Sequence, residues 1–246
     1  MNLYYVHLGL SYYDYIDCNN ELRYEFQKHT NFIDDYFSKK IRKVKFKTDG
    51  TFNMISIAPT EYDVKSTKIV SFNTIKVELP FERIYYEKIK GTEDCSYYLE
   101  LLEQGFKKAS LFKEIPLKSL LDIIEEFRRG GCKNEWLHKK KRFKDDDLEV
   151  VLTCEFTTNY FQLVVTVIQI SRKMELVRGR LIRTDVGISI HEGMYKDILI
   201  AGSDVIITDT SDSPRIRIDK KKIFEGILEY EIIGGKEIVD ILSYQM

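Results

Sequence analysis

The sequence predicts an α+β fold in which antiparallel β-sheets pack with several helices and the C-terminal half is rich in strands. Three observations support this class. An amphipathic helical stripe occupies residues 21–38, apolar and polar residues alternate over much of the chain after residue 147, and only 4 prolines and 13 glycines interrupt 246 residues. We expect a mixed helix and hairpin half over 1–131 and a β-rich half with a C-terminal helix over 147–246, which could also form one continuous domain.

The first element expected is an amphipathic helix over about 21–38. Asn20 is a favourable N-cap for this helix because its side chain can accept a hydrogen bond from a free backbone N–H. The apolar stripe of the helix consists of Leu22, Phe26, Ile33 and Phe37.

A β-hairpin is predicted over the segment RKVKFKTDGTFNMISIAP, with Asp49 and Gly50 in the turn. In such a strand, Val44 and Phe46 would share one face. The opposite face would carry a basic stripe of Lys43, Lys45 and Lys47. A stripe of this kind either protects an edge strand against aggregation or contacts an acidic protein or phosphates.

Two strands and two helices complete the first half. Ser96 can cap the first of these helices, Pro116 suits the first turn of the second, and Gly130 and Gly131 end it. The strands are expected at about 67–72 and 75–79.

The second half is predicted to be mainly β. Thr158 and Asn159 form a turn between its first two strands, and Asp219 can cap a last helix that ends near Gly234 and Gly235. The strands are expected at about 148–156, 160–170, 174–183, 195–201, 204–208 and 214–218.

A charged segment, WLHKKKRFKDDDLEV, lies between the two halves, and its lysines precede its aspartates. A helix would place these charges unfavourably, because cations stabilise the C-terminal end of a helix and anions the N-terminal end. We therefore expect residues 132–146 to form a charged, extended connection that is anchored by Trp136. The alternative is that Trp136 contacts a protein partner, or stacks on the bases of a nucleic acid.

No catalytic or nucleotide-binding motif occurs in the sequence. It lacks the glycine-rich phosphate loops, the turn that exposes a nucleophilic serine, and the Cys and His spacings of zinc sites. The loose pattern of Asp49 with Asp63-x-Lys65 has the form used by metal-dependent nucleases, in which two carboxylates hold the metal ion. Asp49, however, serves better as the turn residue of the hairpin. We therefore predict no catalytic residues, no metal ligands and no cofactor.

The composition argues against a bulk electrostatic attraction to nucleic acid or anionic membranes, because the formal net charge is −1. The N-terminal residues lack the features of a signal peptide, and the longest apolar run, FQLVVTVIQI, has about half the length of a membrane span. We therefore expect a cytoplasmic protein that does not bind membranes. Its four cysteines are expected to be reduced: Cys18, Cys95, Cys132 and Cys154.

The abundance of tyrosine is a second indication of an interaction surface, after the basic stripe at 39–47, which is the better candidate. The chain has 16 tyrosines, and the stretch LYYVHLGLSYYDYIDC combines several of them with acidic residues. Tyrosine is enriched at protein interfaces because it offers a large contact area, a hydroxyl group and few rotatable bonds. The candidate partner-binding residues are Tyr12, Tyr13, Tyr15, Lys43, Lys45, Lys47 and Trp136.

A chain that is balanced in charge, rich in Tyr, Lys and Ile, and without catalytic motifs is similar in general character to the immunity proteins of bacterial toxin systems. This resemblance assigns no role to any individual residue of the chain. It implies a non-catalytic, cytosolic bacterial protein that binds a protein partner, of immunity or antitoxin type. The alternative is a nucleic-acid-binding or metal-dependent nuclease-like protein that uses the basic patches at 39–47 and 139–144. A third candidate is an enzyme whose site is assembled from dispersed residues.

Overall fold

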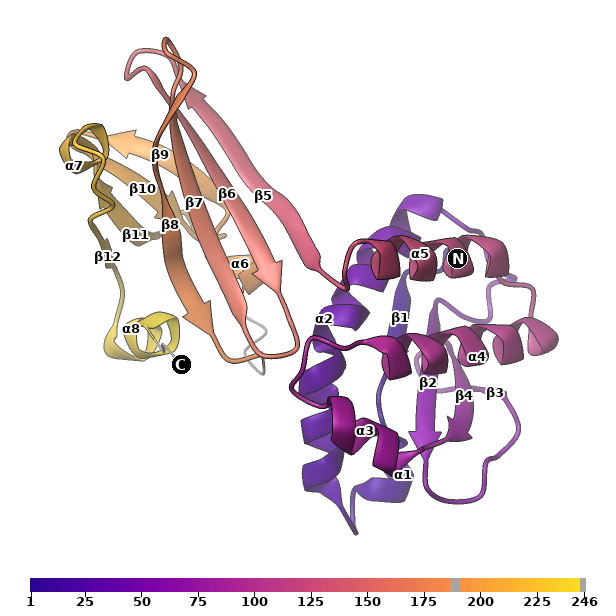
Figure 1. The fold of residues 1–246 in the computed structure, drawn as a ribbon. Helices are drawn as coiled ribbons and strands as arrows, with labels where there is room; N and C mark the ends of the chain where they lie inside the picture. Colours follow the sequence, from indigo (N-terminus) through magenta and orange to yellow (C-terminus); the bar gives the residue numbers. More distant parts are fainter. Residues whose placement is uncertain (187–190, 244–246) are drawn as a thin grey trace. The chain divides into compact units, whose positions relative to one another are not determined.

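The computed structural model describes residues 1–186 and 191–243, and it has an α+β fold, as predicted (Figure 1). The chain divides into two compact units. The first comprises Met1–Asn134 and Thr157–Asn159, and the second comprises Glu135–Phe156 and Tyr160–Met246. Each unit has its own β-sheet structure and its own buried apolar core.

The first unit contains a mixed four-stranded sheet. Strand β2 pairs in parallel with both β1 and β4, and β3 pairs antiparallel with β4. The predicted strands at 67–72 and 75–79 correspond to β3 and β4. In spatial order, the strands are β1 (Tyr5–Leu8), β2 (Met54–Thr60), β4 (Thr74–Pro80) and β3 (Lys68–Val70).

The helices of the first unit leave one face of this sheet open. Helix α4 packs on the buried face, where Gly105 lies against the side chain of Ile57. No described helix is layered over the opposite face, which we call the open face (Figure 1). The helices are α1 (Tyr12–Tyr15), α2 (Asn20–Val44), α3 (Arg83–Ile89), α4 (Ser96–Phe112) and α5 (Leu117–Arg129).

The alternation of side chains along the strands produces these two faces. The residues of the buried face are at most 2% exposed: Val6, Leu8, Ile55, Ile57, Ile75 and Val77. The residues of the open face are mainly polar: Tyr5, His7, Met54, Ser56, Thr74 and Lys76. Since the polar face is not covered by helices, it is available to a ligand or a partner.

The predicted hairpin around Asp49 is wrong, because α2 continues to Val44 and ends at Lys45, which adopts a left-handed conformation with φ 54°. The helix continues because Ile41 extends its buried stripe beyond Phe37 at helical spacing. The strand β2 that follows pairs in parallel with β1, and therefore does not form a hairpin with the residues before it. The basic residues before Lys45 thus lie on a helix and not on one face of a strand.

Helix α2 also covers the outer edge of strand β1. Thr30 Oγ1 donates to the carbonyl oxygen of Leu8 at 2.9 Å, and Asp34 Oδ1 accepts the backbone N–H of Leu8 at 2.8 Å. One turn further, Ser38 Oγ accepts the N–H of Val6 at 3.2 Å. Because Thr30, Asp34 and Ser38 are four residues apart, one face of the helix satisfies the unpaired backbone groups of the edge strand.

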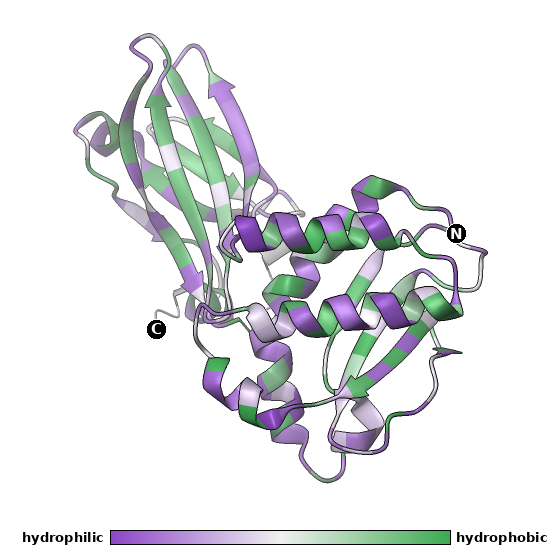
Figure 2. Cartoon of the chain, turned by 45° about the vertical axis from the view of Figure 1, so that its right-hand side comes forward, coloured by the Kyte–Doolittle hydropathy of each residue, from purple (hydrophilic) through white to green (hydrophobic). Residues whose placement is uncertain are grey.

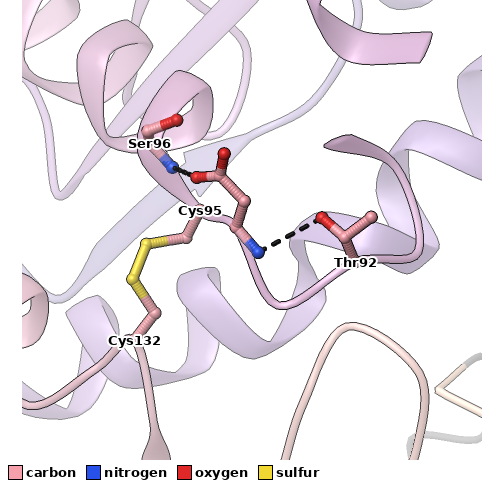
Figure 3. Close-up of a disulfide and its surroundings, with 5 residues drawn as sticks. Thr92, Cys95, Ser96 and Cys132 are labelled. Atoms are coloured by element: carbon pink, nitrogen blue, oxygen red, sulfur yellow. Dashed lines mark hydrogen bonds between the residues drawn. A yellow bond between two sulfur atoms is a disulfide. The ribbon is translucent and has the colours of Figure 1, made fainter. Parts of the chain in front are cut away.

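A disulfide joins Cys95, just before α4, to Cys132, just after α5, with their Cα atoms 6.3 Å apart (Figure 3). This finding corrects the prediction that all four cysteines are reduced, while Cys18 and Cys154 are free. The two half-cystines are 37 residues apart in the sequence, and no short motif links them. Beside the disulfide, Asp94 Oδ1 accepts the backbone N–H of Ser96, the first residue of α4, at 2.8 Å.

The second unit contains two four-stranded sheets, whose apolar faces pack on one another (Figure 1). In both sheets, alternate residues are buried, as in Val205 and Ile207 or Leu163 and Val165. The first sheet has the order β5 (Asn134–Phe143), β6 (Leu148–Phe156), β7 (Phe161–Gln169) and β8 (Met174–Thr184). The second has the order β12 (Tyr230–Ile232), β11 (Pro214–Asp219), β10 (Asp204–Thr208) and β9 (Asp197–Ala201).

The six strands predicted after residue 147 are confirmed as β6 to β11, with small shifts at their ends. The charged segment 132–146, expected as a connection, instead contains the edge strand β5, whose residues are mainly hydrophilic (Figure 2). The predicted last helix is shorter than expected. Asp219 caps α7 (Lys220–Phe224), but Gly226, with φ 78°, ends it, and β12 follows before α8 (Lys236–Ser243). The second unit also contains the short helix α6 (His191–Met194).

The described helices do not include one that combines the length and the apolar character needed to cross a lipid bilayer.

Candidate functional site

The open face of the first unit contains a pocket of about 340 Å³, which we call the open-face pocket. Strands β1, β2 and β4 form its floor, while α1, α2 and the turn between β3 and β4 form its sides. Most of its polar atoms belong to side chains that alternate with the buried core residues. Its lining includes His7, Gly9, Tyr12, Tyr13, Arg23, Gln27, Ser56, Phe72, Thr74 and Lys76.

His7 and Asp34 form a hydrogen-bonded pair at one side of the pocket, with His7 Nδ1 2.7 Å from Asp34 Oδ2. The remaining oxygen of Asp34 accepts the N–H of Leu8, so the carboxylate is held by the edge strand itself. Burial lowers the pKa of the His7 imidazole, but the charge of Asp34 and the hydrogen bond to it outweigh burial and raise this pKa above its usual value. The carboxylate of Asp34 thus stabilises the protonated form of the imidazole more than burial disfavours it.

The second nitrogen of the imidazole, Nε2, has no hydrogen-bond partner among the described residues, whereas Nδ1 is occupied by Asp34. Gly9 is important here because it has no side chain. A Cβ atom at Gly9 would lie 2.7 Å from His7 Nε2 and 2.8 Å from Gln27 Oε1. The glycine thus leaves room for the edge of the imidazole and for the amide of Gln27.

Two further cations line the pocket. Arg23 donates from Nε to Asn20 Oδ1 at 2.9 Å, and its Cζ lies 4.3 Å from the ring centroid of Tyr24 and 5.2 Å from that of Tyr12. No described carboxylate forms an ion pair with Arg23. Lys76 Nζ lies 2.8 Å from Glu78 Oε1, so its charge is compensated. Arg23 is close enough to His7 for its charge to oppose protonation of the imidazole. The pocket therefore has a local excess of positive charge.

Exposed aromatic side chains surround the pocket. Tyr13 is 80% exposed and Phe72 is 91% exposed, while Tyr12 packs edge-on against Tyr13 with 5.4 Å between ring centroids. We call Tyr12, Tyr13 and Phe72 the aromatic rim. Phe72 has φ 60°, a backbone conformation that most residues avoid, so the turn holds this ring outward at some conformational cost.

The predicted partner-binding residues are only partly brought together. Tyr12 and Tyr13 lie on the aromatic rim, whereas Tyr15 is buried and its hydroxyl accepts the backbone N–H of Glu61 at 2.9 Å. Trp136 belongs to β5 of the second unit, where its ring lies 6.3 Å from that of Phe161. The three lysines of the predicted stripe lie outside the pocket, at the end of α2 and just after it: Lys43, Lys45 and Lys47.

The basic residues in the charged segment of the second unit are paired with acids. Lys139 and Lys141 both contact Asp197, with Nζ to carboxylate distances of 3.1 and 2.9 Å. The hydrogen bond from Lys141, together with that from Lys139, lowers the pKa of Asp197 to about 2. Lys140 and Arg142 contact Glu149 in the same way. Four basic side chains thus share two carboxylates, and these ion pairs hold strand β5 in the second unit.

The nuclease-like pattern is not assembled. Asp49 accepts hydrogen bonds from Thr51 and from Lys113 Nζ, the latter at 2.6 Å, before β2 begins. Asp63 and Lys65 follow the end of β2, a strand of seven residues that spans about 20 Å. The described residues also contain no group of three or more His, Cys, Asp or Glu side chains that could hold a metal ion.

Comparison with known proteins does not assign the chain to a family. No protein-family model matches it, no curated protein matches it, and no solved structure matches its fold. The geometry of the open face is therefore the basis for a functional proposal.

Proposed function

We propose that this chain is a non-catalytic protein that binds another protein, and that the open face of its first unit is the contact surface. The observation that carries the proposal is the aromatic rim, in which Tyr13 and Phe72 are among the most exposed large apolar side chains of the described residues. Exposed aromatic rings beside an uncovered sheet face are typical of an interaction surface, because they would otherwise leave apolar area in water.

The partner of our proposal is a protein with an acidic contact surface, because Arg23, which forms no ion pair with a described carboxylate, places positive charge behind the rim. A bacterial toxin neutralised by an immunity or antitoxin protein is the specific case we propose. A nucleic acid is less well supported, because the formal net charge of −1 gives no bulk attraction to it and two lysines of the basic run at 39–47 are paired with acids. Lys39 contacts Asp35 and Lys40 contacts Glu126, each at 2.6 Å.

A matched pair of double variants tests the proposal. Tyr13→Ser with Phe72→Asn removes the two exposed rings, and Asn tolerates the left-handed backbone at position 72. The control is Ile84→Ser with Leu111→Ser, which removes two apolar side chains that are 72% and 90% exposed elsewhere on the first unit. Circular dichroism and thermal unfolding would verify that both variants fold.

Affinity capture from the organism of origin, followed by quantitative mass spectrometry, should return one stoichiometric protein with the wild type and the control. The rim variant should lose that protein. Equal recovery with both variants, or no stoichiometric protein with the wild type, would contradict the proposal.

We also propose a cytoplasmic location, which the disulfide makes testable. Disulfides persist mainly in oxidising compartments, whereas cytoplasmic thiols are usually kept reduced. Alkylation of thiols in intact cells should therefore find Cys95 and Cys132 reduced if the protein resides in the cytoplasm. Full protection of both residues from alkylation in cells would instead indicate an oxidising compartment.

A further inference from the structure

We infer that the open-face pocket receives an acidic side chain of the partner, whose carboxylate is held by Arg23 and His7. This inference rests on the proposed protein-binding function and names the chemistry that the open face recognises. It concerns the carboxylate of an Asp or Glu residue flanked by an apolar residue that packs on the aromatic rim.

The first argument is the unused hydrogen-bonding capacity of two cations. The Nε of Arg23 is bound to Asn20, but the guanidinium makes no ion pair with a described carboxylate. A guanidinium presents its donors as a planar fork that matches the two oxygens of a carboxylate. His7 adds the ring nitrogen Nε2, which forms no hydrogen bond with any described residue.

The second argument is electrostatic. Asp34 compensates the charge of His7, and Glu78 compensates that of Lys76, but the charge of Arg23 remains uncompensated within the described pocket. Like charges in a partly desolvated pocket repel one another, and a bound anion relieves this repulsion. The pocket is therefore complementary to one negative charge.

The third argument concerns the shape and the neutral groups of the pocket. Ser56 lies directly opposite His7 in the parallel pairing of β1 and β2, so its hydroxyl is on the same floor. Gly9 lets the imidazole of His7 and the amide of Gln27 pack against the backbone at the pocket wall, because a Cβ atom there would lie 2.7 Å from His7 Nε2. Tyr13 and Phe72 stand at the rim, where an apolar neighbour of the acidic residue can pack.

Two short peptides serve as probes of the pocket in the absence of the partner. The acidic probe is acetyl-Phe-Glu-amide, and its neutral twin is acetyl-Phe-Gln-amide. Titrations followed by 15N-resolved NMR should shift resonances of His7, Ser56 and their neighbours with the acidic probe. We expect the neutral twin to bind about tenfold more weakly, because a hydrogen bond to a charged group is lost.

The variant Arg23→Gln should weaken binding of the acidic probe by about tenfold, since it removes the uncompensated charge. Arg128→Gln is the matched control, because Arg128 lies on α5 and pairs with Glu125. Equal affinity for both peptides, unchanged binding by Arg23→Gln, or shifts confined to other surfaces would overturn the inference. Tighter binding of phenyl phosphate than of the acidic peptide would also overturn it, in favour of a nucleic-acid phosphate.

The same variants separate this inference from the proposed function. If a captured partner requires Tyr13 and Phe72 but not Arg23, the protein-binding function stands and the carboxylate inference fails. If the acidic peptide binds in an Arg23-dependent manner but no partner protein is found, the pocket assignment stands and the proposed function fails.

Discussion

The two carboxylate oxygens of Asp34 bind different partners, the imidazole of His7 and the backbone of β1. Oδ2 lies 2.7 Å from His7 Nδ1, and Oδ1 accepts the backbone N–H of Leu8 at 2.8 Å. One side chain of α2 thus fixes both the edge strand and the orientation of a pocket residue. A neutral amide at position 34 would keep an oxygen for Leu8 but would lose the negative charge beside His7. The electrostatic role of Asp34 can therefore be separated from its structural role.

The variant Asp34→Asn should lower the pKa of His7. In the wild type, the charge of Asp34 raises this pKa against the opposing effects of burial and of Arg23, and those opposing effects remain in the variant. Because the pKa of His7 is higher in the native state than in the unfolded state, the His7–Asp34 pair stabilises the fold. This stabilisation is fully present below the unfolded pKa of about 6.5 and is lost as the pH rises through the native pKa of His7. The variant should lack this pH dependence.

NMR titration of the imidazole Cε1 protons measures the pKa directly, and His7→Asn identifies the His7 resonance. An unaltered His7 pKa in Asp34→Asn would contradict the role that we assign to Asp34.

Gly105→Ala should destabilise the first unit, although alanine is a better helix former than glycine. A Cβ atom at this position of α4 would clash with the side chain of Ile57 in β2, where Cγ1 is the nearest atom and Cδ1 would lie 2.6 Å away. Overpacking of this kind costs about 1–3 kcal/mol, which exceeds a gain in helix propensity of about 1 kcal/mol. Urea denaturation measures the change, and Gln104→Ala, at an exposed position of the same helix, should be close to neutral.

A double variant tests the mechanism of this destabilisation. Because Ile57→Ala removes Cγ1, Cγ2 and Cδ1, Gly105→Ala should cost less in that background than in the wild type. Equal costs in both backgrounds would show that the contact with Ile57 is not the cause.

Reduction of the disulfide should lower the free energy of unfolding. Cys95 and Cys132 are separated by 37 residues, and closing a loop of this length in the unfolded chain corresponds to about 3–4 kcal/mol of stabilisation. Denaturation with and without a reductant measures the difference. Cys18→Ser should leave it unchanged, because Cys18 is an exposed free thiol.

Thiol counting checks the disulfide independently of stability. Protein that is purified in air without a reductant and then unfolded should react with alkylating reagent at Cys18 and Cys154 only, and reduction should make all 4 cysteines reactive. Reaction at all four sites before reduction would contradict the pairing.

Acid should destabilise the second unit through Asp197. Its pKa is lowered to about 2 by hydrogen bonds from Lys141 and Lys139, whereas an unfolded aspartate titrates near pH 4. The lowered pKa contributes stability that is present above about pH 4 and is lost as the pH falls through the native value near 2. Asp197→Asn should remove this contribution, which we expect to be about 1 kcal/mol at neutral pH for a partly solvated pair.

Thermal unfolding between pH 2 and pH 7 checks the role of Asp197. Asp212→Asn is the control, because the Lys196–Asp212 pair is much more exposed and should contribute little. A wild-type pH profile that coincides with that of Asp197→Asn would contradict the prediction.

The strands of the second half could be predicted because they depend on features that lie close together in the sequence. These are the pattern of apolar and polar residues, the turn residues, and a partner strand that follows directly. Strand β7 follows β6 after a turn at Thr158 and Asn159, so its register is decided within a few residues. By contrast, β1 has only four residues, and its partner β2 lies about fifty positions further along the chain. The basic end of α2 alternated like a strand by coincidence, and only Ile41 continued the helical stripe.

The candidate site was harder to predict, because its residues come from distant parts of the chain. His7 and Asp34 are 27 positions apart, and neither belongs to a recognisable motif. A signal was nevertheless present in the four-residue spacing of Thr30, Asp34 and Ser38, which places polar side chains along one line of a helix. Of the residues predicted for partner binding, Tyr12 and Tyr13 border the pocket, and whether they bind a partner remains a prediction.

The polar side chains of α2 that cover β1 also restrict how a partner can approach. With the backbone groups of Val6 and Leu8 already bonded to Ser38, Asp34 and Thr30, a peptide cannot extend the sheet at this edge by β-augmentation. The opposite edge strand, β3, has only three residues. Recognition at the open face would therefore depend on side chains and not on main-chain pairing, so that single substitutions in a partner should change its affinity strongly.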